Sequence, residues 1–429
     1  MREALRGLTL RGRAFGAGGV TALVCAIVLG QHGLVRVAAL LVALPLVTAF
    51  AISRSRHRLS AARTVSSSTV PAGQTVQVRL ALANDGVVPT GRLLVEDVLP
   101  FALGSRPRFV LPGLAGGAAR SQTLTYQVRP DLRGRYELGP LTVEVSDPFG
   151  LVRLTRTAQG TTSLVVTPRI VALPPNALTG ALDNSGESRP RSFAAGRAED
   201  VTVREYRRGD DLRRVHWRSS ARLGELMVRR EEQPWQARAT IVLDNRVIAH
   251  RGAGVSSSFE TAVTAAASVA THLSQRGFTL RLVTCGGEVP PVWHTPGTAG
   301  TGILESLAVL DTTPATLLDA EPTDLDADTG GGVLVAILGA TTDPDLIALR
   351  RLRHQAGTAL ALVLDVERWQ SGGPGLSASE SLPLLTGQGW QAAAVTPQGG
   401  AGSTEAAVAN AWHELGLGRT TSVGGRSGL

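Results

Sequence analysis

The sequence predicts a multi-domain, membrane-anchored protein with a two-helix transmembrane hairpin, an all-β sandwich and an α/β domain with a parallel sheet. Three observations predict this fold class. Two long apolar runs lie close together near the N-terminus, a period-two pattern of apolar residues follows, and apolar strands then alternate with amphipathic helices. The chain has 429 residues, of which 43% are hydrophobic and 18% charged. That composition supports several cored domains and excludes a wholly disordered protein.

The hairpin is expected within residues 1–58, with spans at about 14–30 and 34–52. The first run carries no charge, and the second contains only Arg36, whose long side chain can reach the membrane interface. Because a spanning helix needs roughly 17–25 apolar residues, both runs are long enough. A cleaved signal peptide is the alternative for the first run, but the second run follows at once without a convincing cleavage site.

Arginine placement predicts the orientation of the hairpin. Four arginines precede the first span and four follow the second, whereas the tip of the hairpin holds only His32 and, just inside the second span, Arg36. The positive-inside rule therefore places both termini and the soluble domains in the cytoplasm. All 43 basic residues are arginine, which together with abundant alanine and glycine suggests a bacterial genome rich in GC, and hence the plasma membrane. The two cysteines, Cys25 and Cys285, cannot form a disulfide framework, and reduced thiols fit that compartment.

Residues 62–170 predict a small β-sandwich. Apolar and polar residues alternate in segments such as 76–82, 124–128 and 141–145, as expected of half-buried strands. Turn-forming residues separate six or seven such segments, and no helical stretch interrupts them. Residues 171–198 lack these signals and are expected to form a linker or long loop.

Residues 199–417 predict a charged block followed by a parallel-sheet domain. The expected strands and helices alternate, with strands at 239–244, 279–285, 333–339, 359–365 and 390–395 and helices at 257–275, 300–310, 344–356 and 403–415. The first helix has one apolar face, formed by Phe259, Val263, Ala266, Ala267, Ala270 and Leu273. The tail at 418–429 is rich in glycine, serine and threonine and is expected to be disordered.

The charged block carries the most specific pattern in the chain. Residues 187–232 contain 12 arginines and 9 acids. We expect a strand at 201–206, a tight turn, a short helix at 212–221 and a strand at 226–230. The candidate motif residues are Arg204, Glu205, Tyr206, Gly209, Asp210, Asp211, Arg213, Arg214, His216, Trp217, Arg218, Ser219, Ser220 and Arg222.

This block resembles the bacterial family known as domain of unknown function 58. The resemblance rests on the REY, GDD and HWRSSAR segments that begin at residues 204, 209 and 216, and on the strand ending at Glu232. It extends upstream to residues 133–153 and to the paired apolar spans. It implies a membrane-anchored protein encoded beside a MoxR-type AAA+ ATPase, with a C-terminal region similar to a von Willebrand factor A domain. It implies no established biochemical activity.

A von Willebrand A domain binds Mg²⁺ through an Asp-x-Ser-x-Ser loop after its first strand, because this hard cation prefers oxygen ligands. Asp244 stands at that position, but Arg246 and Ile248 stand where the two serines would be. Neither supplies an oxygen, and Arg246 adds a charge that repels a cation. We therefore expect a degenerate von Willebrand A-like domain without a metal or other cofactor.

Two further chemistries are weighed for the charged block. A Ser-His-Asp hydrolase could be assembled from His216, Ser219 or Ser220 and an aspartate, but no nucleophile elbow or oxyanion loop accompanies them, so no catalytic residue is assigned. Nucleic acid could meet the arginines, but nine acids in the same stretch oppose that contact, and aromatic residues make up only 4% of the chain. Two roles for the charged block remain equally open. Its arginines and acids can form internal ion pairs, or they can form a surface that docks a protein.

The sequence therefore predicts a non-enzymatic scaffold or adaptor that presents a cytoplasmic docking surface to a MoxR-type AAA+ ATPase or its clients. No Walker A motif occurs, and the absence of lysine excludes its usual form, so nucleotide hydrolysis would belong to the partner. We expect contacts with the lipid bilayer and a protein partner, and neither nucleic acid nor a small-molecule substrate. The alternative is a membrane-tethered hydrolase that uses His216 with Asp210 or Asp211.

Overall fold

The computed structural model describes most of the chain in segments, namely residues 7–54, 59–86, 89–116, 121–147, 149–158, 160–175, 203–206, 215, 217–229, 238–288, 293–295, 299–318, 332–370, 372–397 and 403–417. The chain divides into two compact units, Met1–Arg169 with Leu307–Leu310 and Ile170–Ser306 with Asp311–Leu429. The first unit contains the apolar helices and a β-rich domain, and the second contains the charged block and a parallel sheet. The predicted tail and most of the predicted linker lie outside the described residues.

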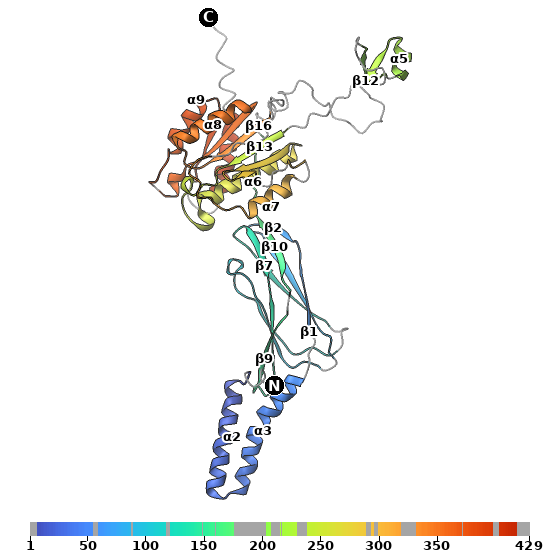
Figure 1. Cartoon of the computed structure of the whole chain (residues 1–429), viewed down its shortest axis with the longest axis vertical. Coiled ribbons are helices and arrows are strands. Elements are labelled where there is room, and N and C mark those ends of the chain that lie inside the picture. The colour runs from blue at the N-terminus through green and yellow to red at the C-terminus, as the bar shows by residue number, and fades with distance from the viewer. Residues whose placement is uncertain are drawn as a thin grey trace. The chain divides into compact units, whose positions relative to one another are not determined.

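The two apolar runs form the helices α2 (Leu10–Leu29) and α3 (His32–Arg54), which lie side by side (Figure 1). Gly30 ends α2 in the left-handed conformation, which glycine adopts without a steric cost. The helices approach closely at Gly19, where an added Cβ would lie 2.6 Å from Cγ2 of Val42. Both are long and apolar enough to cross a membrane, and only 17% and 22% of their most apolar windows is buried. Such exposed apolar surface is consistent with membrane association.

The β-rich domain contains more strands than the six or seven predicted. Within the part of this domain that the structure describes, ten strands form three sheets with the orders β1-β3-β6, β2-β10-β7 and β5-β4-β8-β9. Their bounds are β1 (Leu59–Val65), β2 (Thr69–Pro71), β3 (Val76–Asn84), β4 (Leu93–Asp97), β5 (Arg108–Leu111), β6 (Gln122–Val128), β7 (Gly134–Leu138), β8 (Leu141–Ser146), β9 (Arg153–Ala158) and β10 (Thr162–Thr167). The sequence pattern missed strands such as β2 because three residues are too few to display an alternation.

The long strand β3 follows the predicted pattern. Val76, Val78, Leu80 and Leu82 are buried, and the residues between them are half-buried or exposed. The same domain also buries an ion pair, because Arg63 donates from Nε and Nη2 to the Asp97 carboxylate. Val76 and Val78 belong to one buried cluster and Leu80 and Leu82 to another, so β3 contributes to two cores of this domain.

The second unit is built on a six-stranded sheet with the order β15-β14-β13-β16-β17-β18. Neighbouring strands are parallel throughout, except that the short edge strand β15 runs antiparallel to β14. The strand bounds are β13 (Arg238–Leu243), β14 (Thr279–Thr284), β15 (Gly287–Glu288), β16 (Val333–Leu338), β17 (Thr358–Leu364) and β18 (Gln391–Val395). The predicted parallel sheet is thus confirmed, with one antiparallel edge strand that the sequence pattern did not reveal.

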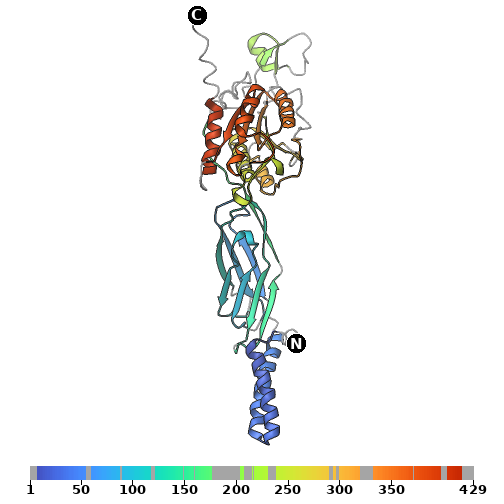
Figure 2. The ribbon, with the colours of Figure 1, turned by 90° about the vertical axis from the view of Figure 1, so that its left-hand side faces the viewer.

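Helices cover the sheet on both faces. They are α6 (Ser258–Gln275), α7 (Ala299–Ala308), α8 (Asp343–Gln355), α9 (Ala378–Gly387) and α10 (Ser403–Leu417). Buried residues of α8 and α9 share one core with β16 and β17. Helices α6 and α10 contact each other and the sheet, and Figure 2 shows α10 in red beside the strands. Helix α9 was not predicted because it contains Pro383, although the capping box of Ser377 and Glu380 marks its start.

The strand order places a topological switch point between β13 and β16. From β13 the chain passes to β14 on one side, and then returns to β16 on the other side of β13. In open sheets of this kind, ligands bind beyond the carboxyl ends of the strands at such a point. The residues that follow β13 and β16 are therefore the first place to look for a functional site.

Candidate functional site

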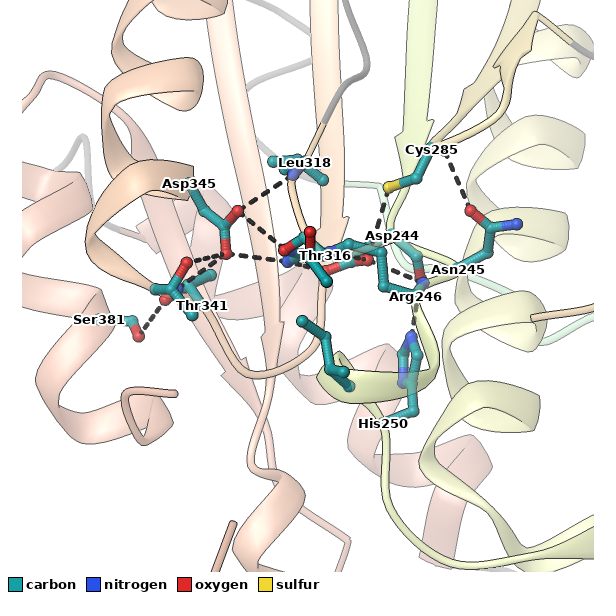
Figure 3. A network of polar contacts seen from close by, with 12 residues as sticks. Asp244, Asn245, Arg246, His250, Cys285, Thr316, Leu318, Thr341, Asp345 and Ser381 are labelled. Atoms are coloured by element: carbon teal, nitrogen blue, oxygen red, sulfur yellow. Dashed lines mark hydrogen bonds and ion pairs between the residues drawn. The ribbon is translucent and has the colours of Figure 1, made fainter. Parts of the chain in front are cut away.

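An arginine fills the switch point. Arg246 lies between Asp244, which follows β13, and Asp345 in the first turn of α8 (Figure 3). Its side chain is 0% exposed, as are those of both aspartates. A buried charge is tolerated only when it is paired and hydrogen-bonded, so the partners of this guanidinium decide what the site can do.

All five N–H donors of the Arg246 guanidinium are used. Nε and Nη2 donate to Oδ1 and Oδ2 of Asp244 at 2.9 and 2.8 Å. Nη1 and Nη2 donate to Oδ1 and Oδ2 of Asp345 at 2.8 and 2.9 Å. The remaining proton on Nη1 reaches the carbonyl of Thr316 at 3.0 Å. The guanidinium is therefore held by a bidentate contact on each side, the geometry in which arginine–carboxylate pairs are strongest.

The Asp345 carboxylate is also fixed by backbone donors. Oδ2 accepts from the backbone N–H and the hydroxyl of Thr342, both at 2.8 Å, and Oδ1 accepts from the N–H of Leu318 at 3.1 Å. The Thr342 contacts form at the N-terminus of α8, where the helix dipole stabilises a negative charge. Asp345 thus joins α8 to the segment before β16 directly at Leu318 and, through Arg246, at Thr316.

The loop after β13 is held by a neutral histidine. Nε2 of His250 donates to the carbonyl of Asp244 at 2.7 Å, since a carbonyl can only accept. Nδ1 then accepts from the hydroxyl of Ser258, 3.1 Å away. Burial lowers the pKa of His250 and outweighs the opposing influence of Asp244. The uncharged His250 ring therefore links the loop after β13 to the first residue of α6 through its two hydrogen bonds.

Cys285 lies on the other side of Asp244. Its Sγ is 3.6 Å from Oδ1 of Asp244, and its backbone N–H donates to the side chain of Asn245 at 3.0 Å. Burial, followed by the nearby Asp244 charge, raises the pKa of the Cys285 thiol to about 12. Such a thiol is unreactive while the site is closed.

These residues fit a guanidinium and do not fit Mg²⁺. The hydrogen bonds and charges of Asp244 and Asp345 raise the pKa of Arg246, although burial alone would lower it. The position two residues after Asp244, where a metal-binding loop would offer an oxygen, instead supplies the cation itself. Within the described residues, no group of three histidine, cysteine, aspartate or glutamate side chains is suited to a metal. The sequence indicated that the positive charge of Arg246 would repel a cation. In the structure, both carboxylates bind this charge.

The described part of the charged block forms a small hairpin with a helix. Strands β11 (Val203–Glu205) and β12 (Met227–Arg229) pair antiparallel, and α5 (Trp217–Leu223) precedes β12. The hydroxyl of Ser220 is buried and accepts the backbone N–H of Met227 at 2.8 Å. This contact ties the helix to the strand that follows and gives the Ser220 hydroxyl a structural partner.

The structure places the remaining motif residues in three groups. Arg204, Glu205, Arg218 and Ser219 lie in β11 or α5, and nothing is described of their side chains. Tyr206 is half-buried, with its N–H bonded to the carbonyl of Leu226 at 2.8 Å, and Arg222 is exposed. Gly209, Asp210, Asp211, Arg213, Arg214 and His216 lie outside the described residues.

The Arg246–Asp345 pair was missed because 99 positions separate the two residues in the sequence. Two signals existed. A largely apolar strand is followed by Asp-x-Arg, which places a charge pair beside the core. Thr-Thr-Asp-Pro-Asp follows another apolar strand and marks a helix start. Parallel strands bring their carboxyl ends to one edge, but only the strand order shows that these two ends are neighbours.

Lowering the pH from 7 to 5 is expected to destabilise the second unit. Burial lowers the folded-state pKa of His250, and burial together with Arg276 lowers that of His272 to about 4. In the unfolded chain both rings titrate near about 6.5, so the unfolded state binds more protons below that pH. The contribution of the two neutral histidines to the free energy of unfolding is therefore fully present above about pH 6.5 and is lost as the pH falls. Urea midpoints at both pH values should differ less for His272→Gln than for wild type, and an unchanged difference would contradict the assignment.

One part of the chain matches a known family. Residues 202–328 match the family described as Protein of unknown function DUF58. The DUF58 match supports the resemblance carried by the motif, and it includes the charged block from residue 202 onward together with β13, Asp244 and Arg246. It ends before β16, so Asp345 lies outside it. No curated protein matched the sequence.

Solved structures resemble the chain only distantly. The CARDB domain of a Pyrococcus furiosus protein, in complex with di-metal ions, is 14% identical, with 26% of this chain and 96% of that domain covered and a TM-score of 0.20. A Pseudomonas fluorescens alkylpurine DNA glycosylase bound to DNA is 14% identical, with 32% and 39% covered and a TM-score of 0.17. A chain of the human zinc 2-glycoprotein complex with prolactin inducible protein is 11% identical, with 26% and 98% covered and a TM-score of 0.20. These scores establish neither a fold nor a function for this chain.

Proposed function

We propose that the protein is a non-enzymatic scaffold, anchored in a bacterial plasma membrane by α2 and α3, that presents a docking surface to a protein partner. In this proposal the β-rich domain is a β-sandwich, the parallel-sheet domain is a degenerate von Willebrand A-like domain, and both face the cytoplasm. The family resemblance motivates the partner, a MoxR-type AAA+ ATPase or its clients. The exposed apolar side chains around α5 carry the proposal.

The docking surface is defined by three exposed apolar residues of the DUF58 region. Trp217 is 69% exposed at the start of α5, Leu223 is 62% exposed at its end, and Leu226 is 43% exposed just before β12. Ser220 and Met227 are buried beneath them and hold the helix against the strand. Tryptophan is enriched at the centres of protein interfaces, and an exposed apolar patch of this kind is typical of a surface that a partner covers.

The filled switch point supports a surface function over binding of a small ligand. The position at which open α/β sheets bind nucleotides or ions is taken by Arg246, whose five donors all have partners inside the chain. A ligand there would have to displace two bidentate ion pairs. Binding through exposed side chains elsewhere requires no such rearrangement.

The docking surface is tested by affinity purification from detergent-solubilised native membranes. We expect an AAA+ ATPase, identified by mass spectrometry, to co-purify with wild type and to be lost with Trp217→Ala. Removing a central tryptophan costs an interface about 2 kcal/mol or more, which is roughly a 30-fold loss of affinity. Phe101→Ala is the matched control, because Phe101 is 99% exposed but lies in the β-rich domain. Equal recovery with Trp217→Ala and Phe101→Ala, at equal bait abundance, would contradict docking through α5.

A further inference from the structure

One exposed aromatic residue lies beside the apolar helices. Residues 147–152, which we call the interface loop, join β8 to β9 in the β-rich domain. Phe149 in this loop is 58% exposed. Asp147 holds the loop in shape, because its Oδ2 accepts the N–H of Phe149 at 3.0 Å and its Oδ1 accepts the N–H of Val152 at 2.7 Å. The phenyl ring is therefore presented on a preformed turn.

The interface loop is bound to the first turn of α2. The backbone N–H of Thr9 donates to the carbonyl of Leu151 at 2.9 Å, and the Thr9 hydroxyl donates to the carbonyl of Gly150 at 2.7 Å. Gly12 permits this approach, because a Cβ there would lie 2.3 Å from the Leu151 carbonyl oxygen. Two hydrogen bonds and a close backbone approach therefore hold the loop against the start of α2.

The loop also packs on the second apolar helix. Leu151 and Val152 are buried against Ala49 of α3, and Leu44 packs partly against the same cluster. Both α3 residues lie within the window His32–Ala51, which is apolar enough to span a membrane. The loop therefore reaches the level of the helices at which lipid would begin.

We propose that the interface loop enters the boundary between lipid headgroups and acyl chains, where the phenyl ring of Phe149 is buried by phospholipid. The occupant is lipid because the loop that carries the exposed ring is hydrogen-bonded to the start of α2 and packs on α3, and both helices leave most of their apolar windows exposed. Apolar aromatic side chains at such a boundary sit about 5–10 Å into the membrane. The side chain of Arg11, exposed on α2 and next to Gly150, is placed to meet lipid phosphates. The inference rests on the proposed membrane anchoring of α2 and α3.

The test measures how deeply a spin label lies at residue 149. The full chain is reconstituted in vesicles of phosphatidylethanolamine and phosphatidylglycerol, with Phe149→Cys in a Cys25→Ser background labelled by a nitroxide. Cys285 is buried and does not compete for the label. Phe101→Cys in the same background is the matched control on the same domain, and native Cys25, exposed on α2, reports on the hairpin. Collisions of each label with oxygen, which partitions into lipid, and with a water-soluble nickel complex are compared.

The expected result is that the label at residue 149 gains oxygen collisions and loses nickel collisions relative to residue 101. If residue 149 matches residue 101 while Cys25 shows a lipid environment, the loop inference is overturned and the anchor stands. If Cys25 also collides freely with nickel, both the anchor and the loop inference fail. Protection of residue 149 from both reagents would show that protein covers the ring, and would likewise overturn the lipid assignment.

Discussion

Replacing Arg246 with alanine is expected to destabilise the second unit by about 3–5 kcal/mol, the cost of removing one partner from a buried ion pair. The variant leaves the Asp244 and Asp345 carboxylates facing each other without the guanidinium that both contact. Urea unfolding of the full chain in detergent micelles measures the change in the free energy of unfolding. The reactivity of Cys285 in a Cys25→Ser background reports on this region, since its thiol lies 3.6 Å from Asp244.

Arg368→Ala is the matched control for Arg246→Ala. Arg368 also pairs with an aspartate, Asp365, but its side chain is 65% exposed and the contact is 3.4 Å long. Exposed pairs of this kind contribute about 0–1 kcal/mol. Equal destabilisation by the two variants would mean that burial does not determine how much the Arg246 pair contributes to the free energy of unfolding.

Gly339→Ala is expected to destabilise the same site by about 1–3 kcal/mol, the usual cost of overpacking. Gly339 follows β16, and an added Cβ would lie 2.1 Å from the carbonyl oxygen of Ala249 in the loop after β13. The obstacle is backbone, so it cannot rotate away. The two loops would have to separate, which would break the hydrogen bond from Ala340 N–H to Ala249 at 2.8 Å. Urea unfolding followed by Cys285 labelling would show both effects.

Gly286→Ala controls for the loss of glycine itself. Gly286 also lies in a turn after a parallel strand, but an added Cβ there meets nothing within 4 Å. We expect its free energy of unfolding to change by no more than about 0.5 kcal/mol. A Gly339→Ala protein as stable as Gly286→Ala would show that the loops after β13 and β16 are not closely packed.

The helices and most long strands of this chain were predictable because each shows its own period. Helix α6 buries the predicted face, including Phe259, Val263 and Leu273, and β3 alternates as predicted. These features depend on residues within one element, where hydrophobic burial repeats every 3.6 or 2 positions. Short strands such as β2, and α9 with its internal Pro383, gave no such signal.

The site was less predictable because it depends on strand order. The sequence singled out Asp244 and noted that Arg246 spoils a metal loop, but it could not show which carboxylate lies opposite. Asp345 reaches Arg246 only because β16 pairs with β13 rather than with β14. The choice of neighbour is made by packing across the whole sheet, which no local pattern records. The role of the charged block as a docking surface stays a prediction.

Chemical rescue tests most directly whether the Arg246 guanidinium is the cation of the switch point. The measurement is the rate at which Cys285 reacts with a maleimide in Cys25→Ser protein, with and without the change Arg246→Ala. We predict that Arg246→Ala accelerates the reaction and that low-millimolar guanidinium, far below denaturing concentrations, slows it again, whereas equal urea does not. An Arg246→Ala protein whose Cys285 is as protected as in the parent, without added guanidinium, would contradict the account.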